Sequence, residues 1–379
     1  MGTMVQRRST MANDNGPELK TYNYLKSFFE GPKLSEEDMK LPMWQRFKLL
    51  QDMRAKDPAG ARNSAIFFRC LLLFQAPTQL YVFIAHIVPF FFGDYGPWVE
   101  YYMKVFVAFV FFNGMANWLC VILYDPGYYK TKDNPNLQLG NFDQPPDQFV
   151  PLIEQSSNGM NGHCVYDLTA KEGLPWEFCN ECEMYIPPRS KHCKHCKKCI
   201  LKRDHHCFMV GNCIGFKNQR YFFVLAFYAL ITGLVGGYFT YKYIQIEVWP
   251  HMYSWTYLIP PVTVVQTLFG QLTIFECLLV FHVILEFLFG TFGFIYFTSQ
   301  LTVVALGKTL YELSRQTGVK SSNSINRNFR SVFGDFWLLN FIFPMTLIFR
   351  QRDDGIHWEG IKIDYNGNEK KNEDANNVI

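Results

Sequence analysis

Charged side chains are scarce in this sequence. Asp, Glu, Lys and Arg make up 18% of its 379 residues, whereas soluble chains average about 25%. The formal net charge is only +3, which is too small to favour nucleic acid binding. Hydrophobic residues make up 49%, and Phe alone occurs 37 times. The composition therefore argues against two or three ordinary soluble domains and favours a membrane protein.

Targeting segments are also missing from the start of the chain. The first sixty residues are polar and charged and contain no early apolar run, so no secretory signal peptide is expected. Position 6 is Gln6 and not the Ser or Thr expected there for N-myristoylation. Residues 41–53 are expected to form a short amphipathic helix, which either lies on a membrane surface or packs on the rest of the protein.

Four long apolar stretches interrupt the polar sequence, and each is long enough to cross a bilayer, which needs about 20 residues. They lie near residues 70–93, 98–124, 221–243 and 277–305. The first two are separated by a very short loop and are expected to form a helical hairpin. Residues 258–276 are also apolar but contain Pro260 and Pro261, so we interpret them as a luminal or interfacial segment. A fifth crossing would place the two termini on opposite sides.

Lys and Arg are absent from the two short loops on one side of these spans. Of the 36 Lys and Arg residues, only Lys104 and Lys242 fall within predicted spans. All the others lie in residues 1–69, 125–220 and 307–379. Positive residues gather on the cytosolic side of membrane proteins. The sequence therefore predicts four spans, with both termini and the segment between spans two and three in the cytosol.

Three ionisable side chains lie in or near the fourth span: Glu276, His282 and Glu286. Such residues are costly inside a membrane and are often functional. Here we expect them to face the helix bundle or to lie near its luminal end, without a chemical role.

Cysteine is abundant, and eight of the eleven cysteines fall between Cys164 and Cys213. Such a cluster means disulfides in an oxidising compartment and metal ligands in a reducing one. A cytosolic loop favours metal. Zinc takes four thiolate or imidazole ligands in a tetrahedron, and residues 179–213 contain enough of them for two complete sites.

The pairing of these ligands is ambiguous from spacing alone. His192 and Cys193 are adjacent, and neighbours in an extended strand point to opposite sides, so interleaved sites are favoured. One site would contain Cys179, Cys182, His192 and Cys199. The other would contain Cys193, Cys196, Cys213 and one later His.

Removing eight ligands leaves Cys207 beside Asp204 and one neighbouring His. A thiol, an imidazole and a carboxylate are the ingredients of nucleophilic acyl transfer. Alternatively, Cys207 is a spare thiol or a ninth ligand. Cys213 precedes the third span by only a few residues, so Cys207 is expected at the membrane face, where a substrate with a fatty chain would reach it.

These residues resemble the DHHC family of protein S-palmitoyltransferases. The letters DHHC stand at residues 204–207 within the family's cysteine spacing, and NCIG follows at residues 212–215. Three flanking motifs also match: DPG at residues 125–127, TLYE at residues 309–312 and NFRSVFG at residues 328–334. The resemblance covers roughly residues 65–350.

The resemblance implies a role for each residue of the motif. It implies that Cys207 accepts a fatty acyl group from acyl-CoA such as palmitoyl-CoA, that His205 is the general base and that Asp204 orients His205. The acyl group then passes to a cysteine of a protein substrate near the cytosolic membrane face. The resemblance also implies two structural zinc ions. One set of ligands would be Cys193, Cys196, His206 and Cys213, and the other would be Cys179, Cys182, His192 and Cys199.

Basic residues of the same segment are candidates for contact with the CoA phosphates, and Met209 is a candidate for contact with the acyl chain. The basic candidates are Arg189, Lys202, Arg203, Lys217 and Arg220. Alternatively, these side chains serve topology and contact anionic lipids.

The sequence departs from the family pattern in two places. Phe208 and Met209 replace the usual Pro-Trp after the nucleophile, which leaves the acyl-chain preference open. Leu310 stands where the family has a second Thr that fixes the catalytic loop, so weaker activity is expected. The alternative function is a zinc-binding membrane scaffold with little or no activity. A RING-type ubiquitin ligase is disfavoured, because its spacing ends in a further Cys-x-x-Cys knuckle.

The predicted fold is an all-α polytopic membrane protein with four transmembrane helices and a small cytosolic two-zinc domain of β-hairpins between helices 2 and 3. The predicted segments are a cytosolic arm (1–63), a transmembrane hairpin (64–124), the zinc domain (125–220), helices 3 and 4 with a luminal loop (221–306) and a cytosolic C-terminal region (307–379). The expected location is the Golgi or endoplasmic reticulum membrane.

Overall fold

The computed structural model describes residues 58–128, 176–252, 254–343 and 353–363, together with Ser35, residues 38–40, Leu174 and Gln351. The chain divides into two compact units, Met1–Phe67 and Phe68–Ile379, and the contacts reported below lie within the second. The amphipathic helix expected at residues 41–53 and Cys164 lie outside the described residues.

Four helices are long and apolar enough to cross a membrane, and they coincide with the four predicted stretches. Their bounds are Asn63–Tyr95, Pro97–Leu123, Gln219–His251 and Ile274–Ala305. The first contains α3 (Pro58–Val82), a π-helical turn (Phe83–Ile87) and α4 (Val88–Phe92); the second is α5 (Pro97–Leu123). The third contains α6 (Gln219–Ile231), α7 (Gly237–Tyr243) and π-helical turns at Thr232–Gly236 and Ile244–Val248; the fourth is α9 (Ile274–Ala305). This arrangement fits a polytopic membrane protein.

Large apolar side chains cover the outer faces of these helices. Phe106 and Phe112 on α5 and Phe294 on α9 are exposed. A helix in a soluble protein keeps its exposed face polar, so such surfaces fit the hydrocarbon interior of a bilayer. Residues 258–276 contain only the short helix α8 (Pro260–Leu268) before α9 begins, which agrees with the expectation that they do not cross the membrane.

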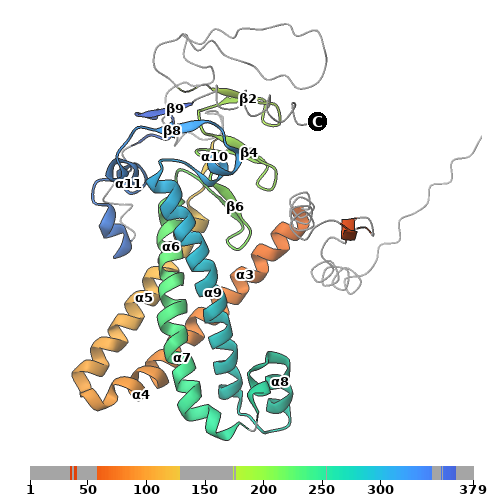
Figure 1. The fold of residues 1–379 in the computed structure, drawn as a ribbon, viewed down its shortest axis with the longest axis vertical. Coiled ribbons are helices and arrows are strands. Elements are labelled where there is room, and N and C mark those ends of the chain that lie inside the picture. The colour runs from red at the N-terminus through yellow and green to blue at the C-terminus, as the bar shows by residue number, and fades with distance from the viewer. Residues whose placement is uncertain are drawn as a thin grey trace, which may run out of the picture. The chain divides into compact units, whose positions relative to one another are not determined.

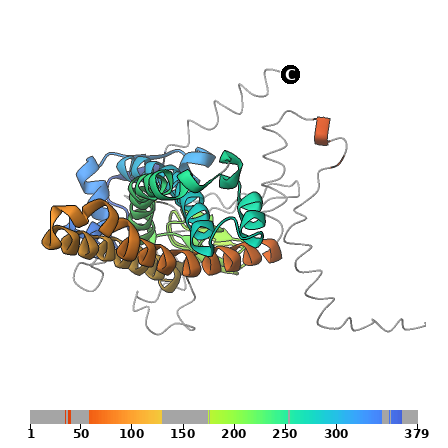
Figure 2. The same ribbon diagram turned by 90° about the horizontal axis from the view of Figure 1, so that it is seen from below.

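Glycines allow the third and fourth spans to touch backbone to backbone. A Cβ added to Gly233 would lie 2.1 Å from the Cα of Gly290. A Cβ added to Gly293 would lie 2.4 Å from the backbone nitrogen of Leu230. Small residues permit such close approach between membrane helices. Figures 1 and 2 show α9 running beside α6 and α7, with α3 and α5 along one side of them.

Six short strands form three antiparallel hairpins between α5 and α6. The pairs are β2 (Glu177–Cys179) with β3 (Met184–Ile186), β4 (Lys191–Cys193) with β5 (Lys198–Ile200), and β6 (His205–Cys207) with β7 (Asn212–Ile214). A two-residue strand, β1 (Gly127–Tyr128), follows α5 and pairs with β5. The hairpins gather at one end of α6 and α9 (Figure 1). Strands this short cannot bury a large apolar core, so other interactions must stabilise them.

The segment after α9 packs against both the hairpins and the helices. It contains α10 (Leu310–Arg315), β8 (Val319–Ser321), α11 (Ile325–Phe333) and β9 (Ile361–Ile363), and β8 pairs with β9. Short 3₁₀ turns occur at Asp38–Lys40, Gly93–Tyr95, Trp249–His251, Trp255–Leu258 and Trp337–Phe341. Phe333 of α11 packs edge-on against Phe223 of α6, with ring centroids 5.3 Å apart. The side chain of Asn328 donates a hydrogen bond to the carbonyl of Ala305 at 2.9 Å, which satisfies the end of α9.

Candidate functional site

The three hairpins repeat one backbone pattern at intervals of 14 residues. Cys179, Cys193 and Cys207 each end the first strand of a hairpin, and each is paired with the residue five positions later. Each turn also contains one residue with a positive φ: Glu183 at 50°, Lys197 at 52° and Gly211 at 71°. The repeat therefore presents equivalent side chains at equivalent positions of successive hairpins.

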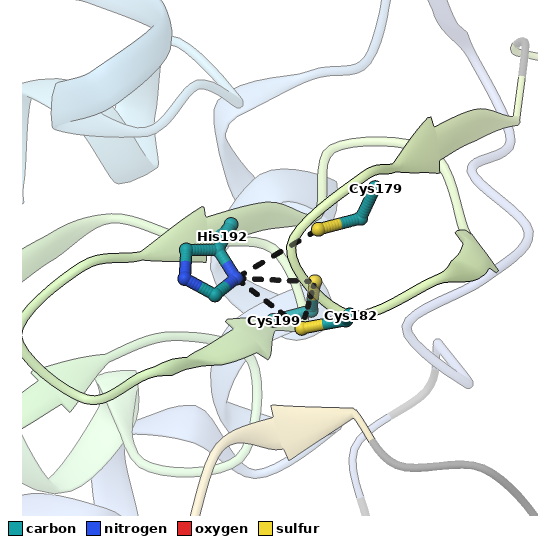
Figure 3. Close-up of side chains that lie close together, drawn as sticks. All are labelled: Cys179, Cys182, His192 and Cys199. Atoms are coloured by element: carbon teal, nitrogen blue, oxygen red, sulfur yellow. Dashed lines mark hydrogen bonds between the residues drawn. The ribbon is translucent and has the colours of Figure 1, made fainter. Parts of the chain in front are cut away.

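The first Cys/His cluster joins the first hairpin to the second (Figure 3). It consists of Cys179, Cys182, His192 and Cys199. Nδ1 of His192 lies 3.7, 3.3 and 4.0 Å from the sulfur atoms of Cys179, Cys182 and Cys199. Ligands of a tetrahedral zinc ion, with bonds of about 2.0–2.3 Å, lie roughly 3.3–3.8 Å from one another. The four side chains therefore fit one zinc ion.

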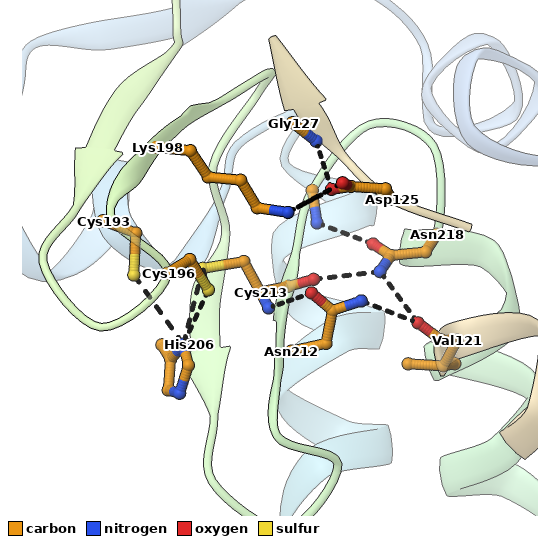
Figure 4. A network of polar contacts seen from close by, with 11 residues as sticks. Val121, Asp125, Gly127, Cys193, Cys196, Lys198, His206, Asn212, Cys213 and Asn218 are labelled. Carbon is orange, nitrogen blue, oxygen red and sulfur yellow. Dashed lines mark hydrogen bonds and ion pairs between the residues drawn. The ribbon is translucent and has the colours of Figure 1, made fainter. Parts of the chain in front are cut away.

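The second cluster joins the second hairpin to the third in the same way (Figure 4). It consists of Cys193, Cys196, His206 and Cys213. Nδ1 of His206 lies 3.7, 3.4 and 3.6 Å from the sulfur atoms of Cys193, Cys196 and Cys213. These spacings fit a second zinc ion equally well.

The two clusters interleave because side chains alternate along β4. His192 and Cys193 are neighbours in this strand and point to opposite sides, so each belongs to a different cluster. The structure thus brings together the two sets of four residues that the family resemblance implied. Among the described residues, the ten cysteines form no disulfide. Metal bound at these clusters would replace the apolar core that the short hairpins lack.

Alternation along β6 places His206 on one side of the strand and His205 and Cys207 on the other. His206 faces the second cluster, so His205 and Cys207 lie on the other side of the strand. Nδ1 of His205 lies 2.8 Å from Oδ2 of Asp204. Among the described residues, Nε2 of His205 has no hydrogen-bond partner, so this nitrogen is available to exchange a proton with a neighbouring group.

Hydrogen bonds and charge control the ionisation of this pair. Burial alone would lower the pKa of His205, but its interactions with Asp204 and Cys207 outweigh burial and raise the pKa to about 9. Burial would raise the pKa of Asp204, but hydrogen bonds from His205, the Leu310 amide and Gln300 outweigh it and lower the pKa. The imidazolium and the carboxylate are therefore the favoured forms near neutral pH, and an imidazolium stabilises a nearby thiolate.

Gln300 is a site residue that the sequence analysis missed. Its Nε2 donates to Oδ2 of Asp204 at 2.7 Å, and its Oε1 accepts from Nε2 of Gln219 at 3.1 Å. Both Gln side chains are fully buried. The only signal in the sequence was a polar residue near the end of an apolar span. That signal does not identify the partner, because Asp204 lies 96 residues away in the sequence.

The short helix α10 presents its first turn to Asp204. The backbone N–H of Leu310 donates to Oδ1 of Asp204 at 2.7 Å, and that of Tyr311 donates to the Asp204 carbonyl at 3.1 Å. Thr309 and Glu312 form a capping box that stabilises this turn. Leu310 thus contacts Asp204 through its backbone, and Gln300 supplies a side-chain donor. The expectation that Leu310 weakens activity stays a prediction.

A buried ion pair connects α10 to the zinc domain. Arg189 donates to both carboxylate oxygens of Glu312, at 2.6 and 2.7 Å, and to the carbonyl of Gly307 at 3.0 Å. The indole of Trp358 lies 4.7 Å from the guanidinium carbon of Arg189. These contacts give Arg189 a structural role.

Hydrogen bonds and an ion pair connect the end of α5 and the residues just after it to the zinc domain (Figure 4). Asp125 forms an ion pair with Lys198 at 2.7 Å. The side chains of Asn212 and Asn218 both donate to the carbonyl of Val121 at 3.2 Å. These contacts connect Asp-Pro-Gly, after the second span, to the zinc domain. The domain also contains Asn-Cys-Ile-Gly, after residues 204–207, so the two motifs belong to one structural unit.

Cys207 lines an apolar cavity of about 180 Å³ among the four helices. Its side chain is buried, and Met209, Phe222 and Tyr296 line the cavity beside it. The ring of Tyr296 stacks on that of His205, with centroids 5.9 Å apart. The predicted contact of Met209 with an acyl chain is consistent with this position. Phe208 does not line the cavity; its ring packs edge-on against His206, with centroids 4.9 Å apart.

Arg69 on α3 contacts the turn that follows Cys207. Its Nε and one terminal nitrogen donate to the carbonyl of Val210 at 2.9 and 2.6 Å. This contact joins the first span to the catalytic hairpin. Its two partners lie 141 residues apart in the sequence, which is why sequence analysis did not single out Arg69.

Three of the four remaining basic candidates lie near aromatic rings. Lys202 is buried and lies 5.3 Å from the ring centroid of Trp358; burial and the charge of Arg189 lower its pKa to about 8. Arg203 lies 5.4 Å from the ring of Tyr311. Arg220 lies over Tyr221, and Lys217 is partly buried. Their contact with CoA stays a prediction.

Comparison with known proteins agrees with the site. A family model described as DHHC palmitoyltransferase matches residues 174–317. Palmitoyltransferase ZDHHC15 of Xenopus laevis is 29% identical over 190 residues, which cover 46% of this chain and 52% of the relative. Palmitoyltransferase ZDHHC2 of Homo sapiens is 32% identical over 167 residues, which cover 43% of this chain and 42% of the relative. Probable protein S-acyltransferase 13 of Arabidopsis thaliana is 29% identical over 126 residues, which cover 33% of this chain and 37% of the relative. The matches span about half or less of these relatives.

Proposed function

We propose that this chain, whose residues 174–317 match the DHHC palmitoyltransferase family model, is a protein S-acyltransferase that forms an acyl thioester on Cys207. The observation that carries the proposal is the hydrogen bond of Asp204 to His205, next to a thiol that lines an apolar cavity. A thiol that had only to bind metal would need neither the His–Asp pair nor the cavity.

The proposed reaction consists of two thioester exchanges. In the first, His205 holds the proton of Cys207, the Cys207 sulfur attacks the carbonyl carbon of acyl-CoA, and the bond between that carbon and the CoA sulfur breaks. CoA leaves as a thiol with the proton from His205. In the second, a substrate cysteine gives its proton to His205 and attacks the same carbon, and Cys207 leaves and recovers a proton. No ATP is needed, because each step replaces one thioester by another.

Other residues position these groups in the proposal. Asp204 fixes the ring of His205, while Gln300 and the α10 amides fix Asp204. Zinc at the two clusters would be structural, since each cluster offers four protein ligands and leaves no open position. We assign the acyl chain to the apolar cavity beside Met209. The CoA phosphates are assigned to the basic candidates that remain accessible, Arg203 and Lys217.

The proposed setting is a membrane with both termini and residues 125–220 on the cytosolic side. The supporting observation is the gathering of Lys and Arg on that side of the four spans. Substrates would be proteins whose cysteines lie close to the cytosolic membrane surface, and the proposed organelle is the Golgi or the endoplasmic reticulum.

Intact mass spectrometry tests the proposal. The purified full chain is incubated with palmitoyl-CoA and measured before and after hydroxylamine, with zinc content determined in parallel. We expect an added acyl mass that hydroxylamine removes and that Cys207→Ser lacks. Zinc-loaded protein that gives no Cys207-dependent adduct with any chain length would favour a scaffold function instead.

A further inference from the structure

The cavity above Cys207 has an unusual polar patch in its wall. Most of its lining is apolar, as expected for a fatty chain. Gln75 and Gln79 of α3 and Glu286 of α9 also line it. Glu286 is buried inside the fourth span. The sequence analysis expected this residue to face the helix bundle without a chemical role, and the first part of that expectation is met.

Only half of the Glu286 carboxyl group is hydrogen bonded. Oε1 accepts from Nε2 of Gln79 at 2.5 Å and from the hydroxyl of Thr240 at 3.1 Å. Among the described residues, Oε2 has no hydrogen-bond partner.

A second polar group without a partner belongs to Gln75, one helical turn from Gln79 on α3. Nε2 of Gln75 has no hydrogen-bond partner within the part of the chain that the structure describes, and its side chain is buried. Gln75 and Gln79 are four residues apart on α3, so they share one face of the helix. A buried polar atom without a partner is destabilising, because it has lost its hydrogen bonds to water and gained none in return. Two polar atoms without a partner among the described residues, Oε2 of Glu286 and Nε2 of Gln75, therefore belong to residues that line the same cavity.

The polar patch lies part of the way along the cavity. Tyr296 marks the catalytic end, since its ring stacks on His205. Glu286 is ten residues earlier on α9, or about 15 Å along the axis at 1.5 Å per residue. A further apolar cavity of about 110 Å³ shares Gln79 and continues to Phe83 and Phe106. A chain that starts at Cys207 would thus pass the patch and have apolar space beyond it.

We propose that this patch is a subsite for a hydroxyl group carried along the acyl chain, so that the enzyme prefers hydroxylated fatty acyl groups to plain ones. The proposal rests on the proposed function of Cys207. A hydroxyl has one O–H donor and two acceptor lone pairs, so a hydroxyl placed between Oε2 of Glu286 and Nε2 of Gln75 can hydrogen-bond to both atoms. A plain methylene chain satisfies neither. Sites built to hydrogen-bond a hydroxyl reject the analogue that lacks it, because their buried polar groups stay unpaired.

A competition between acyl chains tests the subsite. The full chain in lipid nanodiscs receives palmitoyl-CoA together with one hydroxypalmitoyl-CoA, and intact mass spectrometry measures the ratio of the two acyl-enzymes. The hydroxyl is moved along the chain from one experiment to the next. We expect a preference of about tenfold or more for hydroxyls at positions that reach Glu286, and none for hydroxyls close to the thioester.

Variants separate the subsite from general damage. Glu286→Leu should abolish the preference while acylation by palmitoyl-CoA persists, and Glu286→Gln should retain part of it. Gln75→Leu should lower it. Glu247→Leu makes the same kind of change at an exposed position of the third span and should leave the ratio unchanged.

Three outcomes would count against the subsite. Equal use of plain and hydroxylated chains at every position overturns it, with the proposed acyltransferase function intact. A positional preference that survives both Glu286→Leu and Gln75→Leu assigns the preference to other residues. Absence of an acyl-enzyme with every chain defeats the proposed function and the subsite together.

Discussion

The second and third hairpins have the same backbone and different chemistry. In the second, residues 190–193 read Ser-Lys-His-Cys; in the third, the equivalent residues 204–207 read Asp-His-His-Cys. His192 and His206 occupy equivalent cluster positions. Cys193 binds with Cys196 in the second cluster, but Cys207 is followed at the equivalent position by Val210. Cys207, the proposed nucleophile, thus stands where the preceding hairpin has Cys193 of the second Cys/His cluster.

The difference follows from the order of the hairpins. Each cluster takes two cysteines from one hairpin and a His and a Cys from the next. The third hairpin is followed by α6, not by a fourth hairpin, so no partner ligands face Cys207. At the equivalent positions, Asp204 and His205 replace Ser190 and Lys191, and Cys207 lines the apolar cavity instead of belonging to a Cys/His cluster.

The largest expected effect separates the two equivalent cysteines. Cys193→Ser should lose one zinc ion per chain and destabilise the protein by several kcal/mol, because structural zinc is coupled to folding. Cys207→Ser should keep both zinc ions and the thermal stability of the wild type, yet form no acyl-enzyme. Metal analysis measures the zinc content of each variant, and thermal unfolding measures its stability. Equal zinc loss in the two variants would contradict the division of roles.

A smaller effect is expected when the third hairpin loses its carboxylate. Asp204→Asn removes the charge that raises the pKa of His205 to about 9, so that pKa should fall. Since the imidazolium is the form lost as pH rises through this pKa, the alkaline decline of acylation should move to lower pH. The rate near neutrality should fall by roughly 10³–10⁴-fold, as for loss of the carboxylate in other triads. An unchanged pH profile of acylation would show that Asp204 does not control His205.

Gln300→Leu tests the support of that carboxylate from the fourth span. It removes a hydrogen bond to a charged group, worth about 1.5–3 kcal/mol, so acylation should slow by about 10–100-fold. Zinc content and the KM for palmitoyl-CoA should stay close to wild type, since Gln300 belongs neither to the clusters nor to the cavity lining. A Gln300→Glu variant is the matched comparison: its carboxylate would repel Asp204. A rise in KM alone would indicate a binding role instead.

The smallest effect is expected from restoring the missing cysteine. Val210→Cys recreates a Cys-x-x-Cys knuckle in the third hairpin. Without a following hairpin to supply His and Cys, zinc should remain at two ions per chain, and the loss of a buried methyl group should cost about 1 kcal/mol of stability. Under reducing conditions, acyl-enzyme should still form. A third tightly bound zinc would show that the hairpin order does not explain the free thiol.

Local patterns in the sequence were enough to predict the four spans and the two Cys/His clusters. The four spans are visible because an apolar run of about twenty residues matches the thickness of a bilayer and exceeds the length of an ordinary core helix or strand. Both sets of Cys and His residues come together as the resemblance implied, because each cluster is built from hairpins adjacent in the sequence.

Contacts between distant segments could not be predicted in this way. Gln300, Arg69 and Gln79 each contact a residue more than 90 positions away, and nothing local marks the partner. Leu310 illustrates a second limit. Its side chain lacks the family's hydroxyl, but its backbone N–H donates to Asp204, and backbone donors are the same for every residue type except proline.

The contact of Gly233 with Gly290 has a bearing on how acyl-chain preference can diverge among relatives. With a Cβ predicted 2.1 Å from the facing Cα, even one added methyl group would push the third and fourth spans apart. Phe289 and Gly293, on either side of Gly290, line the cavity that we assign to the acyl chain, so the width of this cavity would change with that separation. Replacing Gly233 or Gly290 by Ala would thus change the width of the cavity in a single step, without changing any residue that touches Cys207.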